Sequence, residues 1–370
     1  MEAPAVPSSQ TELFETWQEH GRSPLDYVTT RFDDHDWVFI GEYHRVRDDV
    51  TLVVDLIPRL HGETEVRHLA MEFLCTEQTE RANELIGAPT FDRRQAIDFF
   101  RTQFVGWGYE EYLDIFRSTW QSNRDRASER GPFRLVGLGP CPDYEVMHYG
   151  EEAAAARERE KQEGYDQHMA DTLESQLLDR GLPALVYTGI AHSTARFVEY
   201  RYGTDEQLVR MGNLVFRKPF RDRMFFIALH APFWDAGRET EIYPFDGVLD
   251  RLMRDHGRPI GFDVRGSPFA TLVHENQSPR AITSYSFAEL YDGYIMWDTT
   301  LKQTVGVTCI DDWIVSEGQF TYFWRHLSNA EASRRFSEMP YEEFLADRCA
   351  PRADYGPEFA QRFRRLPDLD

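Results

Sequence analysis

Short apolar runs alternate with longer segments in which apolar residues recur every three or four positions. The short runs end in small or polar residues and are continuously apolar, which is typical of strands that are covered on both faces. In the first half of the chain they occupy residues 36–42, 67–73, 133–139 and 183–189. Strands that alternate with helices predict right-handed crossovers and a mostly parallel sheet.

The segments between these runs have the length and the spacing of helices. They read VTLVVDLIPRLHG, TEQTERANELIG, FDRRQAIDFFRTQF and GYEEYLDIFRSTWQSNRDRA, followed by a stretch from EEAAAARERE to MADTLESQLLDRG. Further strand-like runs follow in RMFFIALHAPF, RPIGFDVRG and LYDGYIMWD, and residues 330–370 indicate a helical C-terminal tail. We therefore expect an α/β fold with a mostly parallel central sheet flanked by helices, and one domain over residues 1–370.

Composition and charge exclude some classes of partner. The 370 residues are 41% hydrophobic, enough for a large core, and carry a formal charge of -22. A nucleic acid or an anionic membrane requires a basic face, so neither is expected as a partner. The N-terminal residues lack the basic and apolar regions of a secretory signal, and no later stretch has the length of a membrane span. We expect a cytoplasmic protein.

The four cysteines give no sign of a cysteine-based site. Cys75, Cys141, Cys309 and Cys349 lie far apart and form no C-x-x-C pair. We expect reduced thiols that pack in the core.

Polar residues at the ends of the predicted strands indicate a functional site. Two runs end in the same pattern, G-x-x-H, in GEYH (residues 41–44) and GIAH (residues 189–192). A glycine at the strand end permits a tight turn, and a histidine three residues later can point back over the sheet edge. Ligands of open parallel sheets bind outside the carboxyl ends of the strands, so both histidines are expected there.

The carboxylate of Glu72 is expected in the same region. Glu72 interrupts the apolar run LAMEF, and a buried carboxylate requires a cation or hydrogen-bond donors. His44, Glu72 and His192 would form a minimal catalytic metal set that leaves positions for water and substrate. Nitrogen and oxygen ligands without thiolate suit manganese, iron, cobalt or zinc.

GEYH and GIAH, with AMEF between them, resemble the motifs of the superfamily that contains ChaN, TraB and Tiki proteins and, more distantly, erythromycin esterases. GWGYEEYLDIF, a helix that leads into the third strand, is similar to the corresponding segment of ChaN-like domains. The resemblance covers residues 30–200. It implies a divalent-metal peptidase site in the Tiki branch and macrocyclic-ester hydrolysis in the esterase branch. By position it implies catalytic or metal-binding roles for His44, Glu72 and His192, and a base or further ligand in Glu42.

The chain departs from these branches. We expect neither the lipobox of ChaN nor the membrane anchor of Tiki proteins, and the printed residues do not reproduce the full glycine and histidine signature of the esterases. The resemblance therefore does not identify the substrate of this chain.

Further polar residues are candidates for substrate binding. Arg45 and Arg47 follow the first motif and are able to clamp a carboxylate or phosphate bidentately. Tyr112 belongs to the aromatic segment GYEEY, and His230 and Asp263 end later apolar runs, where they are expected to face the same crevice.

The sequence favours a metal-dependent hydrolase of a small-molecule or peptide-like ester or amide, in which the ion activates water and Glu42 relays the proton. Three alternatives remain open: a haem- or ligand-binding protein that uses the histidines as axial ligands, an iron- or manganese-dependent redox enzyme, and an interaction module without catalysis.

Overall fold

A computed structural model describes most of the first 300 residues. The described residues are 10–103, 108–125, 131–140, 164–200, 207–217, 219–235, 240–274, 277–278, 285–300, 306–308 and 310. The predicted helical tail at 330–370, the EEAAAARERE segment, and Cys141, Cys309 and Cys349 lie outside them. Cys75 is buried, as expected, and forms no disulfide with another described residue.

A seven-stranded sheet forms the centre of the fold, in the order β10-β14-β7-β1-β4-β2-β3. The strands are β1 (Trp37–Glu42), β2 (His68–Cys75), β3 (Arg134–Gly139), β4 (Ala184–Gly189), β7 (Met224–Leu229), β10 (Ile260–Asp263) and β14 (Gly293–Met296). Neighbours pair in parallel, except that β10 runs antiparallel to β14. The predicted α/β class with a mostly parallel sheet is confirmed.

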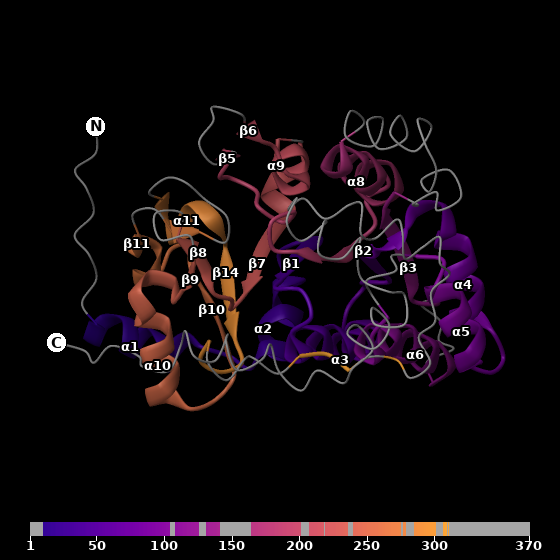
Figure 1. Ribbon diagram of the computed structural model, residues 1–370, viewed down its shortest axis with the longest axis horizontal. Helices are drawn as coiled ribbons and strands as arrows, with labels where there is room; N and C mark the ends of the chain where they lie inside the picture. The colour runs from indigo at the N-terminus through magenta and orange to yellow at the C-terminus, as the bar shows by residue number, and fades with distance from the viewer. Residues whose placement is uncertain are drawn as a thin grey trace, which may run out of the picture.

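Helices cover both faces of this sheet (Figure 1). They are α1 (Gln10–His20), α2 (Pro24–Arg31), α3 (Arg47–Glu63), α4 (Thr79–Gly87), α5 (Arg93–Phe100), α6 (Glu110–Asp125), α8 (Tyr165–Leu173), α9 (Met211–Phe216), α10 (Val248–His256) and α11 (Phe287–Leu290). Helices α3 and α6 pack together along one face, while α8 and α9 lie on the other. Each helix buries its apolar side, as Leu52, Leu56 and Leu60 of α3 do at helical spacing.

Short strands lie outside the central sheet. They pair as β5 (Glu199–Tyr200) with β6 (Gln207–Leu208), β8 (Phe233–Asp235) with β9 (Thr240–Ile242) and β12 (Gln277–Ser278), and β11 (Val273–His274) with β13 (Tyr285–Ser286). Among the described residues, no helix combines the length and the apolar character that a membrane crossing requires.

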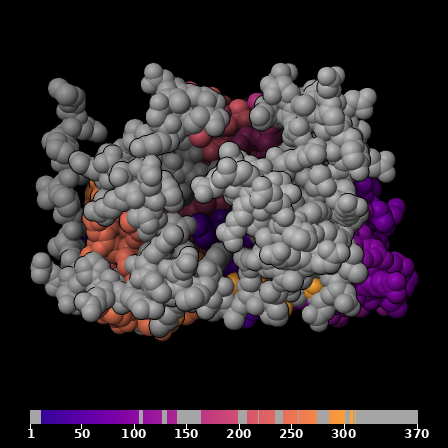
Figure 2. Space-filling model, in the orientation of Figure 1, coloured from indigo at the N-terminus to yellow at the C-terminus, as the bar shows by residue number. Residues whose placement is uncertain are grey.

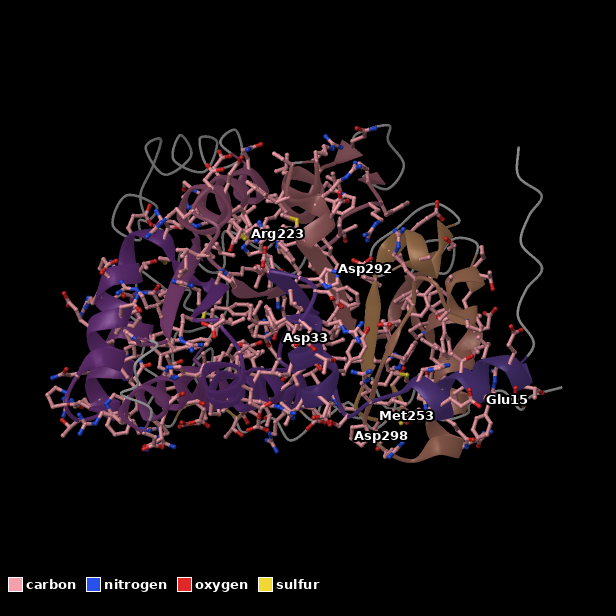
Figure 3. The ribbon with its side chains drawn as sticks, turned by 180° about the vertical axis from the view of Figure 1, so that it is seen from behind. Glu15, Asp33, Arg223, Met253, Asp292 and Asp298 are labelled. Carbon is pink, nitrogen blue, oxygen red and sulfur yellow. The ribbon has the colours of Figure 1, made fainter. Side chains whose placement is uncertain are left out.

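The carboxyl ends of the parallel strands lie at one edge of the sheet. Asp292 and Asp298 lie just before and just after β14 and mark its two ends (Figure 3). Strands β1 and β4 are direct neighbours near the middle of the sheet, with Glu42 opposite Gly189. The carboxyl ends that carry GEYH and GIAH therefore emerge side by side.

Candidate functional site

The two G-x-x-H motifs interlock. A Cβ on Gly189 would lie 2.5 Å from Cε1 of His44, so the imidazole of the first motif rests on the glycine of the second. A Cβ on Gly41 would overlap the Ser193 hydroxyl and lie 2.9 Å from Cα of Ile190, so the loop after the second motif crosses the first glycine. Neither glycine has a positive φ. Both are needed for close approach, and not for the tight turn that the sequence suggested.

Glu42 anchors the His44 ring. Its buried carboxylate, 1% exposed, accepts hydrogen bonds from Nδ1 of His44 at 2.7 Å, from the Tyr112 hydroxyl at 2.6 Å and from the Tyr187 hydroxyl. Burial and the Glu42 charge hold the pKa of Tyr187 well above its usual range, so this hydroxyl keeps the proton that it donates. With Nδ1–H directed at Glu42, Nε2 of His44 has the lone pair of a base. The His44 side chain is 33% exposed.

A second histidine is held between two carboxylates. Nδ1 of His192 lies 2.7 Å from Oδ1 of Asp166, in the first turn of α8, and Nε2 lies 3.4 Å from Oε1 of Glu72. Burial by itself would lower the pKa of His192, but Glu72 and Asp166 outweigh it and raise the pKa above 6.5. His192 is thereby favoured as an imidazolium.

Glu72 connects the two histidines. Its Oε2 accepts the backbone N–H of Gly189 at 2.7 Å, next to an irregularity in the pairing of β2 with β3, a feature that re-aims side chains near sites. Nε2 of His44 and Oε2 of Glu72 both lie within 3.4 Å of the point that a Cβ on Gly189 would take. Glu42, His44, Glu72 and His192 thus come together at one edge. In Figure 2, indigo and dark magenta atoms of the N-terminal half of the chain are visible near the middle of this face.

Asp166 gives this site a predicted pH signature. Burial would raise its pKa, but the His192 hydrogen bond and charge lower it below 3.8. The carboxylate therefore stabilises the fold above about pH 4, and this contribution is lost as the pH falls through its folded pKa. The imidazolium of His192 stabilises it below about pH 6.5, and this is lost as the pH rises through its raised pKa.

We expect Asp166→Asn to lower the free energy of unfolding by about 1–3 kcal/mol, with the largest loss between about pH 4 and 6.5. Denaturant unfolding at several pH values measures this difference. His192→Gln in the same series should remove the loss of stability toward alkaline pH. A deficit of equal size at every pH would mean that the pair is not ionic.

The expected metal set does not form among the described residues. Nowhere in this part of the chain are three or more His, Cys, Asp or Glu side chains placed to hold a metal ion, and this includes His44, Glu72 and His192. The carboxylates on Nδ1 of both histidines nevertheless match the partners that usually orient metal-bound histidines.

The predicted substrate-binding residues differ in their positions. Tyr112 reaches the site through Glu42, as above. Arg45 follows His44 with a positive φ of 72°, and its guanidinium lies 5.9 Å from the centre of the Tyr109 ring. Arg47 instead bonds Glu111 and the Thr308 hydroxyl, each at 3.0 Å, and so ties α3 to α6.

His230 follows β7 as expected, but its side chain is fully buried in the core. Its Nδ1 lies 3.0 Å from the Tyr294 hydroxyl and Nε2 lies 2.8 Å from that of Thr300. The expectation that it faces the crevice is therefore wrong.

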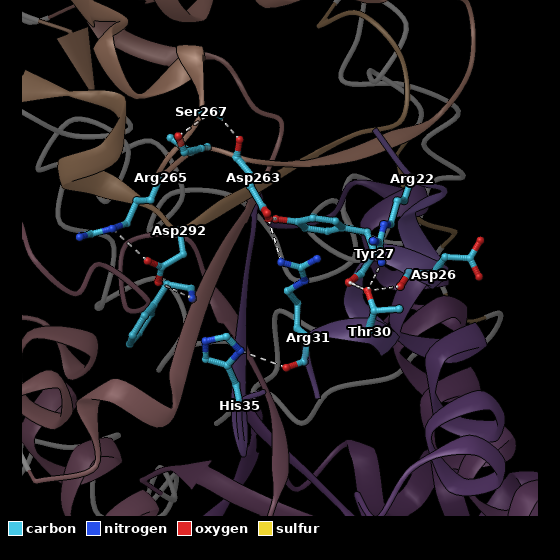
Figure 4. Close-up of polar contacts among 12 residues, drawn as sticks. Arg22, Asp26, Tyr27, Thr30, Arg31, His35, Asp263, Arg265, Ser267 and Asp292 are labelled. Carbon is cyan, nitrogen blue, oxygen red and sulfur yellow. Dashed lines mark hydrogen bonds and ion pairs between the residues drawn. The ribbon is translucent and has the colours of Figure 1, made fainter. Parts of the chain in front are cut away.

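The expectation for Asp263 is also wrong, because β10 runs antiparallel. Its end lies opposite Gly293 at the start of β14, and not at the carboxyl ends of the parallel strands. Asp263 accepts hydrogen bonds from the Tyr27 hydroxyl at 2.8 Å and from Arg31 at 2.9 Å (Figure 4). It connects α2 to β10.

Asp263→Ala should therefore reduce stability and leave any activity of the candidate site unchanged. It leaves the buried Tyr27 hydroxyl without its acceptor, which costs about 1–3 kcal/mol of unfolding free energy. Denaturant unfolding beside an activity assay measures both effects, with Asp263→Asn, which keeps an acceptor oxygen, as the matched control. A loss of activity without a loss of stability would return Asp263 to the list of substrate-binding candidates.

Two residues of the candidate site, Tyr187 and Asp166, were not predicted from the sequence. Tyr187 lies inside an apolar strand run and Asp166 opens a helix far from both motifs, so neither has a spacing that connects it to the histidines. The only available signal was the polar hydroxyl of Tyr187 two residues before the glycine of GIAH.

Comparisons of sequence find no protein-family profile and no curated protein that match this chain. Comparison of structures gives an erythromycin esterase, EreC, in its open conformation, with a TM-score of 0.54 and 11% identity over 80% of this chain and 99% of that one. The chain shares its fold with this esterase. A succinoglycan biosynthesis protein has a TM-score of 0.58 and 13% identity over 80% of this chain and 98% of that one.

ChaN of Campylobacter jejuni with cofacial haem also matches, with a TM-score of 0.37 and 11% identity over 55% of this chain and 85% of that chain. The resemblance that the motifs indicated is confirmed at the level of the fold by the erythromycin esterase. At these identities the comparisons establish no activity.

Proposed function

We propose that this protein is a hydrolase that cleaves an ester or amide bond in a small-molecule or peptide-like substrate. The observation that carries the proposal is the Glu42–His44 pair: a buried carboxylate orients a partly exposed imidazole through a 2.7 Å hydrogen bond. A histidine oriented in this way is the usual general base of hydrolytic enzymes. The fold shared with an erythromycin esterase supports the same class of reaction.

The proposed reaction begins at Nε2 of His44. This nitrogen takes a proton from a water molecule as the water oxygen attacks the substrate carbonyl carbon. The C–O or C–N bond then breaks, and the imidazolium returns its proton to the leaving alcohol or amine. Glu42 stabilises the imidazolium, with Tyr112 and Tyr187 holding its carboxylate in place.

Glu72 and His192 form the second side of the proposed site. The Gly189 N–H fixes one oxygen of Glu72, and the imidazolium of His192 lies beside the other. This arrangement holds the Glu72 carboxyl group close to His44, where it accepts a hydrogen bond from the attacking water. Asp166 is a positioning residue, because it acts through His192.

The metal-dependent version of this proposal is tested separately. The described donors form no three-residue metal group, and the steps above use side chains alone. If a divalent ion does bind, His44, Glu72 and His192 are the residues that would hold it, and it would supply Lewis-acid activation of water.

The test is hydrolysis of a panel of aryl and alkyl esters, macrocyclic lactones and peptide amides, with and without a chelator, alongside the metal content of the purified protein. Turnover that survives chelation supports the side-chain mechanism, whereas turnover that chelation abolishes and one metal restores supports the metal-dependent one. No turnover, together with a Soret band on haem titration, would replace the hydrolase proposal with haem binding.

A further inference from the structure

A second acidic side chain lies in the core beneath the candidate site. Asp49, in the first turn of α3, is 0% exposed. Its Oδ2 accepts the backbone N–H of Tyr43 at 3.2 Å, and Oδ1 has no hydrogen-bond partner among the described residues. An ionised carboxylate with so few donors would be very costly to bury.

Among the described residues, no cation interacts electrostatically with Asp49. Those that interact with it electrostatically are Glu42 of β1, Asp48 of its own helix, Tyr187 of β4 and Tyr294 of β14. Burial is the main reason why the pKa of Asp49 lies well above its ordinary value of 3.8, and the negative charge of Glu42 raises it further.

The hydrogen bond from the Tyr43 N–H connects Asp49 to the candidate site. Tyr43 lies between Glu42 and His44 in the GEYH turn, and α3 begins just after that turn without a side-chain cap at Val46. Asp49 thus reaches back from the helix and fixes the backbone between the carboxylate and its imidazole. Among the described residues the carboxyl group of Glu42 has three hydrogen-bond donors, whereas that of Asp49 has one, so a negative charge on Asp49 would be far less well stabilised.

We propose that Asp49 is a positioning residue that works as an uncharged carboxylic acid and holds the Glu42–His44 turn through the Tyr43 N–H. The positioning role of Asp49 rests on the proposed role of His44 in hydrolysis, whereas the charge state of Asp49 does not. Two variants separate the two parts. Asp49→Asn keeps an acceptor for the Tyr43 N–H and cannot ionise, and Asp49→Ala removes the acceptor.

The charge state is tested by unfolding wild type and Asp49→Asn in denaturant at several pH values above about 4. A neutral Asp49 binds a proton that the unfolded chain has released. Stability is then lost as the pH rises toward the folded pKa, so the folded-to-unfolded ratio of wild type relative to Asp49→Asn should fall about tenfold per pH unit. Asp33→Asn, at an exposed position labelled in Figure 3, is the control for the loss of one carboxylate. A relative ratio independent of pH would overturn the proposal.

Two further measurements complete the test. The infrared difference spectrum of wild type minus Asp49→Asn at neutral pH should contain the carbonyl band of a carboxylic acid, and a carboxylate band instead would overturn the assignment.

On any ester that the wild type hydrolyses, Asp49→Asn should keep kcat within a few fold, and Asp49→Ala should lower it at least about tenfold. Equal losses in both variants would mean that the charge is needed, and full activity in Asp49→Ala would mean that Asp49 positions nothing. If wild type hydrolyses nothing, the proposed function fails while the unfolding result still decides the charge state.

Discussion

His44→Ala is expected to lower kcat for ester hydrolysis by about 10²–10⁴-fold, which is the usual contribution of general base catalysis. The ring is one-third exposed and packs at its edge against Phe73, so its removal opens no large cavity in the core. Stability should therefore change little. Glu42 keeps the hydroxyls of Tyr112 and Tyr187 as donors in the variant, which prevents an orphaned buried charge.

The measurement is steady-state kinetics of purified wild type and variant on the best ester of the panel, with added imidazole as a chemical rescue. His20→Ala is the matched control, because His20 is a largely exposed histidine at the end of α1. Activity within a few fold of wild type in His44→Ala would contradict the base assignment, and would leave Glu72 as the residue to examine next.

Gly189→Ala is expected to lower activity nearly as much as His44→Ala does, although Gly189 lies in the sheet and has no side chain that could take part in the reaction. The added methyl would occupy the space of the His44 ring, 2.5 Å from Cε1, so the ring has to rotate away. Because a side chain can move where backbone cannot, the fold should persist. We expect a fall in kcat of about 10²-fold or more, since misplacement of about 1 Å is enough for such a loss.

A double-mutant cycle makes this prediction specific. In a His44→Ala background, Gly189→Ala should cost no further activity and little stability, because the group it displaces is absent. Gly41→Ala is the contrasting variant. Its methyl would meet Cα of Ile190 at 2.9 Å, so we expect a loss of about 1–3 kcal/mol of unfolding free energy. Additive losses in the cycle would show that Gly189 acts independently of His44.

The sequence predicted the strands well, because parallel strands covered on both faces are continuously apolar and easy to locate. Runs at 36–42 and 183–189 differ from β1 and β4 by one residue at the N-terminal end. Strand order was not predictable, since nothing local in either run encodes that they pair. The direction of β10 was also missed, because a short apolar run reads the same in both directions, and Asp263 was misplaced as a result.

The candidate site was predicted in part, for a similar reason. Polar residues that end or interrupt apolar strands stand out against their neighbours, which is how His44, Glu72 and His192 were singled out. Asp166 and Asp49 lie in first turns of helices, where acidic residues are common without any functional role. Their importance comes from tertiary contacts with His192 and Tyr43, which no spacing along the chain reveals.

The interlocked glycines have a consequence for biosynthesis. A ribosome delivers β1, β2 and β3 well before β4, so a growing chain has His44 and Glu72 before it has Gly189 to support the ring or His192 to face the carboxylate. Contacts between distant parts of a chain form late in folding, because loop closure must come first. We therefore expect nascent chains that end before residue 184 to be inert toward substrate, and activity to appear in one step with the docking of β4 between β1 and β2.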